Sequence, residues 1–167
     1  MQTQRLVLAA LFAALPVALS FFPGAFPVAG ARVLPWQHTI NALAGVLVGP
    51  WYAALAATVA AILRNALGVG TPLAFPGGIP GALLVGFAYL LWRRDWVGLL
   101  EPIGTGLVGA TIGALIIAPA VMGRAIPLMT LIVAFLASSI PGAILGYLVL
   151  KALRRTGVVP QIARREV

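Results

Sequence analysis

The sequence predicts an all-α integral membrane protein, folded as a compact bundle of six transmembrane helices. Hydrophobic residues make up 62% of the 167 residues and charged residues only 8%, whereas about 25% of the residues of an ordinary soluble domain are charged. The apolar runs are continuous and do not alternate with polar residues, which favours helices over a transmembrane barrel. Six helices of about 20 residues would use roughly 120 positions. The remaining chain is too short for a separate soluble catalytic domain.

Glycine and proline residues separate the apolar runs and set the expected ends of the helices. We expect helices at residues 4–22, 36–49, 50–67, 78–94, 101–121 and 127–153. The second helix is short, which favours a tilted or only partly spanning segment. Pro50 suits the first position of the third helix, where a missing N–H costs no hydrogen bond. The helices form a transmembrane domain over residues 1–153, followed by a basic cytoplasmic tail over residues 154–167.

The first apolar run resembles a signal peptide, because Arg5 precedes it. Its apolar stretch extends from Leu6 to Phe22, about 17 residues, which is long for the apolar region of a signal peptide. No clear small-x-small cleavage site follows it. We therefore expect this segment to remain as the first transmembrane helix.

Basic residues orient the bundle, because Lys and Arg are in excess on cytoplasmic segments. Three basic residues fall at one end of the expected spans, namely Arg32, Arg64 and Arg124. Eight fall at the other end: Arg5, Arg93, Arg94, Lys151, Arg154, Arg155, Arg164 and Arg165. This asymmetry predicts that both termini lie in the cytoplasm.

The three acidic residues, Asp95, Glu101 and Glu166, are all expected on the cytoplasmic side. Glu101 is expected to pair with Arg93 or Arg94 at the inner end of the fifth helix. The outer half would then hold arginines but no carboxylate. Because a tight site for a cation normally includes an anionic partner, we expect a neutral or mildly anionic ring-shaped ligand instead of a polyamine, a quaternary amine or thiamine.

The start of the second helix concentrates polar residues that a lipid-facing helix would not tolerate. Gln37 and Asn41 are four residues apart and His38 is three before Asn41, so all three share one stripe of the helix. These side chains offer hydrogen-bond donors and acceptors for a heteroaromatic ring and a hydroxyl, and Trp36 offers an apolar face for stacking. The alternative is that they bond to neighbouring helices and stabilise the bundle.

A second polar cluster ends the third helix and forms the following outer loop. Arg64 and Asn65 can cap free carbonyls at the helix C-terminus, while Asn65, Thr71 and Phe75 are candidates to contact a ligand, the last two as a lid. Arg32 is a further candidate binding residue on this side. The loop is a poor match to a phosphate-binding P-loop because the Lys-Ser/Thr pair is absent. Ser138, three residues before Pro141, is expected to bond to local backbone.

Small residues recur every four positions in the first helix, at Ala10, Ala14 and Ala18. Such a stripe lets another helix approach closely, either within the bundle or in a partner subunit. No nucleotide-binding motif is present, no acidic residue is expected mid-membrane, and the chain has no cysteine. We expect no metal and no cofactor, and any uphill transport would need a partner that supplies energy.

Two runs, GARVLPWQHTINALAGVLVGPWYA and RNALGVGTPLAFPGGIPGALL, resemble the ThiW family, the substrate-binding (S) components of energy-coupling-factor (ECF) vitamin transporters. The resemblance covers nearly the whole chain and implies a multi-pass protein of a prokaryotic plasma membrane. It implies capture of 4-methyl-5-(2-hydroxyethyl)thiazole, a thiamine precursor, on the outside. It further implies docking on a transmembrane T component driven by two cytoplasmic ATPases, through Ala10, Ala14 and Ala18, with the bundle toppling to release its cargo.

Other functions stay open at this point. The ligand could be another thiamine precursor, such as hydroxymethylpyrimidine, or a phosphorylated thiazole bound by Arg32 and Arg64. An intramembrane enzyme using His38 is disfavoured, because the expected site lacks paired carboxylates or a metal-ligand cluster. A purely structural membrane subunit is disfavoured by the concentration of polar residues on one side.

Overall fold

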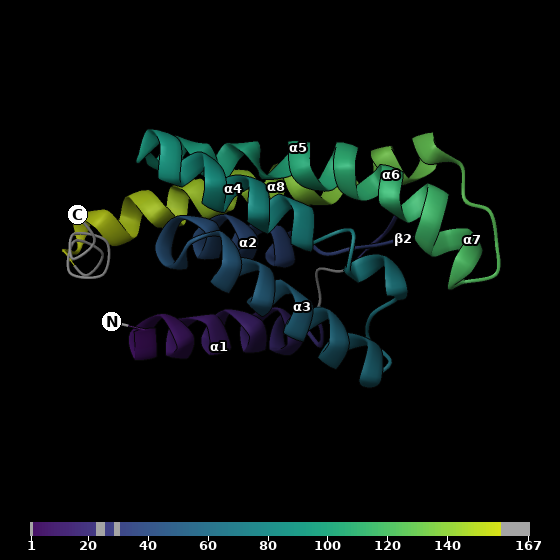
Figure 1. The fold of residues 1–167 in the computed structure, drawn as a ribbon, viewed down its shortest axis with the longest axis horizontal. Helices are drawn as coiled ribbons and strands as arrows, with labels where there is room; N and C mark the ends of the chain where they lie inside the picture. The colour runs from purple at the N-terminus through teal and green to yellow at the C-terminus, as the bar shows by residue number, and fades with distance from the viewer. Residues whose placement is uncertain (1, 23–25, 29–30, 158–167) are drawn as a thin grey trace.

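The computed structural model describes residues 2–22, 26–28 and 31–157, and within them six helical segments lie along the long axis of the molecule (Figure 1). Four are single helices in the first two thirds of the chain: α1 (Gln2–Leu19), α2 (Pro35–Val48), α3 (Pro50–Ala66) and α4 (Ile79–Trp92). The last is α8 (Leu128–Arg155). These bounds lie within a few residues of those expected from the sequence, because glycine and proline interrupt the apolar runs there.

The fifth segment is helical from Asp95 to Ala120 but changes its winding along the way. It consists of η2 (Asp95–Leu100), α5 (Glu101–Ile103), η3 (Gly104–Gly109), α6 (Ala110–Ile112), η4 (Gly113–Ile117) and α7 (Ala118–Ala120). The η2 segment is a 3₁₀-helix, whereas η3 and η4 are π-helical stretches. The segment therefore begins six residues before the expected start at Glu101, and this shift changes where the Glu101 side chain lies.

Short elements connect the helices at the end of the bundle that carries the candidate site. Strands β1 (Phe26–Val28) and β2 (Ala31–Val33) form an antiparallel pair between α1 and α2. The 3₁₀-helix η1 (Pro72–Ala74) lies between α3 and α4. The β-pair was not expected from the sequence, where three-residue strands leave too short a pattern to recognise.

Four helical stretches within the described residues are long and apolar enough to cross a membrane. They are Gln2–Leu19, Pro72–Trp92, Asp95–Ala120 and Leu128–Arg155. The other two, α2 and α3, have 14 and 17 residues, fewer than the ~20 that a full span needs. The all-helical bundle with several apolar spans is confirmed, whereas six complete crossings remain a prediction.

Helix α2 is the central element, since 10 of its 14 residues are buried. Glycines allow its neighbours to approach closely. A Cβ on Gly45 would lie 2.6 Å from Cγ1 of Val85 on α4, and one on Gly146 of α8 would lie 2.8 Å from Cβ of Ala42. Polar side chains on α2 therefore face protein and not lipid.

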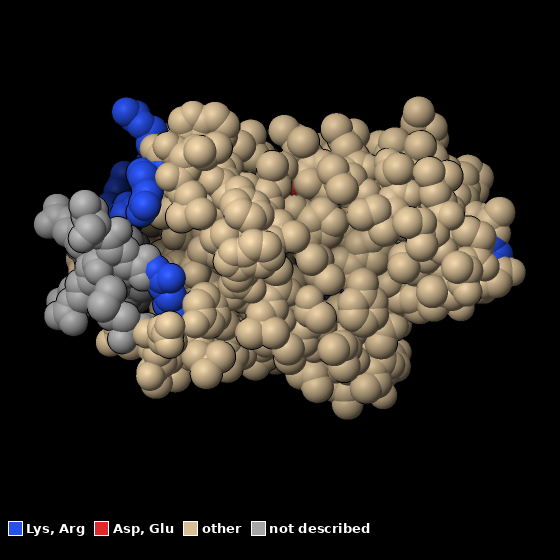
Figure 2. All heavy atoms as spheres, viewed as in Figure 1, with Lys and Arg blue, Asp and Glu red and all other residues tan. Residues whose placement is uncertain are grey.

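The surface is apolar along the bundle and basic at one end. Figure 2 shows a mostly uncharged face, with most of its visible Lys and Arg side chains at the end where α1 begins and α8 ends. A single basic spot lies at the opposite end. This distribution agrees with the sidedness inferred from the sequence, and the orientation of the bundle in a membrane remains a prediction.

Candidate substrate-binding cavity

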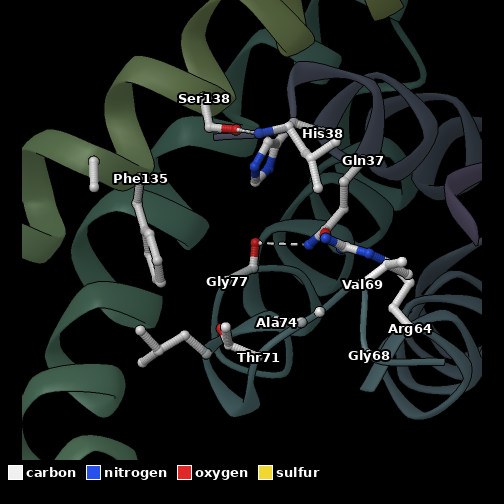
Figure 3. A pocket seen from close by; sticks show the side chains of 14 residues that line it. Gln37, His38, Arg64, Gly68, Val69, Thr71, Ala74, Gly77, Phe135 and Ser138 are labelled. Carbon is white, nitrogen blue, oxygen red and sulfur yellow. Dashed lines mark hydrogen bonds between the residues drawn. The ribbon is translucent and has the colours of Figure 1, made fainter. Parts of the chain in front are cut away.

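A cavity of about 220 Å³ lies where the N-terminal part of α2 meets the loop after α3, the η1 turn and α8. Its wall is polar on the α2 and α3 side and apolar on the α8 and η1 side. The lining residues are Leu34, Gln37, His38, Arg64, Gly68, Val69, Gly70, Thr71, Leu73, Ala74, Gly77, Ala134, Phe135 and Ser138. Figure 3 shows the imidazole of His38 pointing into the space between Phe135 and Gly77.

The His38 side chain joins this cavity to a buried carboxylate. Its Nδ1 lies 2.9 Å from Oε1 of Glu101, which is completely buried at the start of α5. The same oxygen accepts hydrogen bonds from Nδ2 of Asn41, at 3.1 Å, and from Oγ1 of Thr105, at 2.8 Å. Three side chains from two helical segments therefore converge on one carboxylate oxygen.

This arrangement corrects the expectation for Glu101. The carboxylate does not pair with Arg93 or Arg94 at the inner end of the bundle but lies inside it, next to the polar stripe of α2. The physical reason is the additional 3₁₀ stretch from Asp95, which places Glu101 six residues into the helical segment. The expectation that the outer half of the bundle lacks a carboxylate is wrong. The argument against cationic ligands that rested on this expectation is therefore wrong as well. An acidic residue is buried within the apolar bundle after all.

Arg64 forms the cationic part of the cavity wall. It is buried at the C-terminal end of α3, and its guanidinium donates to Oε1 of Gln37. The Gln37 amide in turn donates from Nε2 to the carbonyl of Gly77, over 3.3 Å. The sequence suggested Arg64 mainly as a helix cap, whereas the structure also makes it a cavity residue.

The candidate residues predicted from the sequence separate into two groups. Gln37, His38 and Thr71 line the cavity, as expected for binding residues. Asn41 lies behind the wall, where its amide donates to Glu101 and, over 3.1 Å, to the carbonyl of Gly78. Asn65 donates to the carbonyls of Ala61 and Thr71 and so shapes the loop.

Two further candidates are not in the cavity wall, and a third has a side chain that the structure does not describe. Trp36 and Phe75 are half-buried and neither lines the cavity. Arg32 is opposite Pro27 in the β1–β2 pair, and its side chain lies outside what the structure describes. The aromatic residue in the wall is Phe135 of α8, and the lid expected from Thr71 and Phe75 stays a prediction.

The α8 contribution to the cavity was missed. Phe135 and Ser138 line it, and Ser138 Oγ accepts a hydrogen bond from the backbone N–H of Leu34, over 2.9 Å. Ser138 therefore bonds to a backbone group, as expected, but this group is 104 residues away and not local. The only local signal was a hydroxyl close to Pro141, and no local pattern identifies which helix α8 contacts.

The small-residue stripe of α1 faces outward. Ala10, Ala14 and Ala18 are exposed, while Ala9 and Ala13 on the adjacent face are buried against the bundle. The exposed stripe is therefore not used for packing within the described part of the chain. It remains a candidate surface for a partner helix.

A second cavity, of about 210 Å³, lies at the other end of α2. Arg5, Tyr52, Tyr89 and Arg93 contribute to its wall. Among the residues that the structure describes, no group of three or more His, Cys, Asp or Glu side chains could hold a metal ion.

Sequence comparison adds a family assignment to this geometry. The family described as "Thiamine-precursor transporter protein (ThiW)" matches residues 6–156, which include most of α1 and every later element through α8. Comparisons with curated proteins and with solved structures each found no match. Because the family match spans most of the sequence, the chain belongs to the ThiW family of thiamine-precursor transporters.

Proposed function

We propose that this chain is the substrate-binding S component of an ECF importer and that it captures 4-methyl-5-(2-hydroxyethyl)thiazole from outside the cell. One observation carries the proposal: a small, mixed polar and apolar cavity is built mostly from the two sequence runs that first indicated the family, with α8 completing its wall. The apolar wall of Phe135 and Leu73 suits the ring, and the polar wall of His38 and Arg64 suits its nitrogen and hydroxyl.

The size of the cavity favours a single-ring ligand. A volume of about 220 Å³ is below the ~300–1,000 Å³ of pockets that enclose drug-sized molecules. Thiamine carries two rings and a cationic thiazolium, so it is disfavoured by size and by the permanent charge of Arg64 in the wall. The size of the cavity and the charge of Arg64 replace the argument from a missing carboxylate, which the position of Glu101 contradicts.

Other thiamine precursors form the second candidate class. Arg64 offers a guanidinium, which binds phosphate oxygens well, so a phosphorylated thiazole is the strongest competitor. Hydroxymethylpyrimidine is also a single ring with a hydroxyl and would fit by size. Competition between these compounds and the thiazole alcohol, measured on one sample, ranks them.

Transport requires partners in this account. The exposed Ala10, Ala14 and Ala18 stripe supports close approach of a helix, and we assign it to a T component that couples to two cytoplasmic ATPases. An S component of this kind lies in the plasma membrane of a prokaryote and performs no chemistry on its cargo.

Uptake of labelled hydroxyethylthiazole tests the proposal. Cells that make this chain together with a T component and both ATPases should accumulate the label, and cells that lack either the chain or the ATPases should not. Accumulation that is independent of the ATPases would contradict the ECF assignment. Accumulation of hydroxymethylpyrimidine in place of the thiazole would transfer the proposal to that precursor.

A further inference from the structure

The His38–Glu101 contact sets the hydrogen-bonding character of the cavity. His38 is the one histidine of the chain, and its imidazole lines the cavity while Nδ1 contacts Glu101 behind the wall. A neutral imidazole has one N–H donor and one bare acceptor nitrogen. The hydrogen bond made by one nitrogen decides which role the other nitrogen plays.

Oε1 of Glu101 is surrounded by donors. The Asn41 amide can only donate from Nδ2, and the Thr105 hydroxyl lies 2.8 Å away, closer than to its other acceptor, the Gly77 carbonyl at 3.4 Å. An oxygen that receives two such bonds acts as a carboxylate acceptor toward His38 as well. Nδ1 of His38 therefore carries the proton and donates it.

The charges around the cavity favour a neutral imidazole. Arg64 supplies one positive charge and Glu101 one negative charge. Arg64 donates to Gln37, which donates to the Gly77 carbonyl, and this carbonyl lies 3.4 Å from the Thr105 hydroxyl that donates to Glu101. A second proton on His38 would leave a net positive charge in an apolar bundle, which is costly. With the proton on Nδ1, Nε2 is left as an acceptor.

We propose that Glu101 is a positioning residue that fixes the Nδ1–H form of His38, so that Nε2 accepts a hydrogen bond from a hydroxyl or amino group of the ligand. This inference rests on the proposed function for the identity of the ligand, but the state of His38 can be tested without any ligand. It assigns the ligand's donor group to the His38 side of the cavity and leaves its acceptor atoms to Arg64.

Nitrogen-15 NMR of the histidine ring tests whether His38 carries its proton on Nδ1. Because the chain has one histidine, a ¹⁵N-histidine-labelled sample in detergent at neutral pH gives one pair of ring signals. We expect Nδ1 at the position of a protonated ring nitrogen and Nε2 at that of an unprotonated one. Two protonated nitrogens, or a proton on Nε2 alone, would overturn the inference.

Variants separate positioning from a general structural role. Glu101→Gln keeps an acceptor oxygen and should keep the Nδ1–H form, whereas Glu101→Leu should give a mixture of the two ring forms. Thr105→Val is the matched control, since Thr105 donates to the same oxygen but does not contact His38. It should keep the wild-type ring signals. A ring spectrum of Glu101→Leu that is identical to that of the unaltered protein would overturn the positioning role. If Glu101→Leu does not fold, the spectrum of the unaltered protein still decides which ring nitrogen of His38 carries the proton.

Ligand analogues test whether Nε2 of His38 accepts a hydrogen bond from the ligand. The methyl ether of hydroxyethylthiazole keeps the oxygen acceptor but lacks the donor, and 5-ethyl-4-methylthiazole lacks both. In calorimetric titration both should bind about tenfold or more weakly than the alcohol, as expected for one lost hydrogen bond. Equal affinity of the ether and the alcohol would overturn the acceptor role of Nε2.

The proposed function and the inferred state of His38 can fail separately. If neither the alcohol nor hydroxymethylpyrimidine binds, the proposed function and the ligand half of this inference both fall. The ring spectra of the ligand-free protein and of its Glu101 variants would still decide whether Glu101 fixes His38.

Discussion

Nδ1 of His38 on α2 lies 2.9 Å from Oε1 of Glu101 on α5, across 63 positions of sequence, and both side chains are buried. The contact joins the central helix to the fifth helical segment directly behind the cavity wall. Asn41 belongs to the same cluster without lining the cavity. Loss of its side chain should therefore lower stability, whereas loss of His38 should also weaken ligand binding.

Phe135 should contribute to affinity and not only to stability. Phe135→Leu removes part of the apolar wall, and we expect hydroxyethylthiazole to bind several-fold more weakly, measured by calorimetric titration. Phe12→Leu is the matched control, because Phe12 is similarly buried, at 6% exposed against 9%, but does not line the cavity. Both variants should lose about 1 kcal/mol of stability. Equal affinity in the two variants would remove Phe135 from the site.

Arg64 should determine whatever affinity the chain has for a phosphorylated thiazole. Arg64→Gln removes the cation from the cavity wall, so binding of the phosphate ester should weaken more than binding of the alcohol, by about tenfold or more. Competition against labelled alcohol measures both. Arg124→Gln is the control, since Arg124 is exposed and outside the cavity. A uniform loss for both ligands would contradict a phosphate-binding role.

Gly81 should be required for the packing of the buried polar cluster. A Cβ at this position would lie 2.5 Å from both Oε1 of Glu101 and Oγ1 of Thr105. Gly81→Ala should therefore destabilise the protein by about 1–3 kcal/mol, measured by thermal unfolding in detergent.

Gly98→Ala provides the contrast for Gly81→Ala. A Cβ there would make only ordinary contacts, 3.5 Å from Cβ of Ala42 and 3.7 Å from Cδ1 of Leu150. Stability should stay the same or rise by a few tenths of a kcal/mol, because the unfolded chain loses freedom. If both alanines were equally tolerated, the close approach of α4 to Glu101 would be refuted.

The α1 stripe should matter for transport but not for ligand binding. Ala14→Trp adds a large side chain to an exposed surface, so titration should give wild-type affinity while uptake falls to background. Val133→Trp is the control, because Val133 is 56% exposed and belongs to α8 and not to α1. Full uptake in Ala14→Trp would show that the partner docks elsewhere.

Sidedness can be measured with introduced cysteines, since the chain has none of its own. We expect a cysteine at Thr156 to be labelled by a membrane-impermeant reagent only after the membrane is opened, and one at Arg124 to be labelled in intact cells. Both positions are exposed. The reverse pattern would place both termini outside.

Local patterns were sufficient for the helices and for part of the site. Apolar runs bounded by glycine and proline predicted six helical segments, and the spacing of Gln37 and His38 to Asn41 predicted one polar stripe on α2. These signals lie within a few residues of one another. The helical period alone is enough to place them.

Contacts between helices far apart in sequence were beyond the reach of local patterns. Glu101 was misplaced because the 3₁₀ stretch from Asp95 has no strong sequence signature, and six more helical residues move its carboxylate from the bundle end into the interior. Phe135 and Ser138 were not recognised as cavity residues because their position depends on the packing of α8 against α2. Asn65 and Asn41 were expected to contact a ligand, but the partners that the structure gives them are protein groups.

Calorimetric titration of the purified protein in detergent with hydroxyethylthiazole, hydroxymethylpyrimidine and thiamine tests the central claim most directly. We expect tight binding of the thiazole alcohol and weak binding of thiamine, because the cavity accepts one ring and Arg64 repels a cation. Hydroxymethylpyrimidine also fits by size, and the proposed thiazole function predicts that it binds more weakly than the thiazole alcohol. Preferential binding of thiamine would contradict both the size and the charge arguments. Absence of binding by all three compounds would contradict the assignment of this cavity as the substrate site.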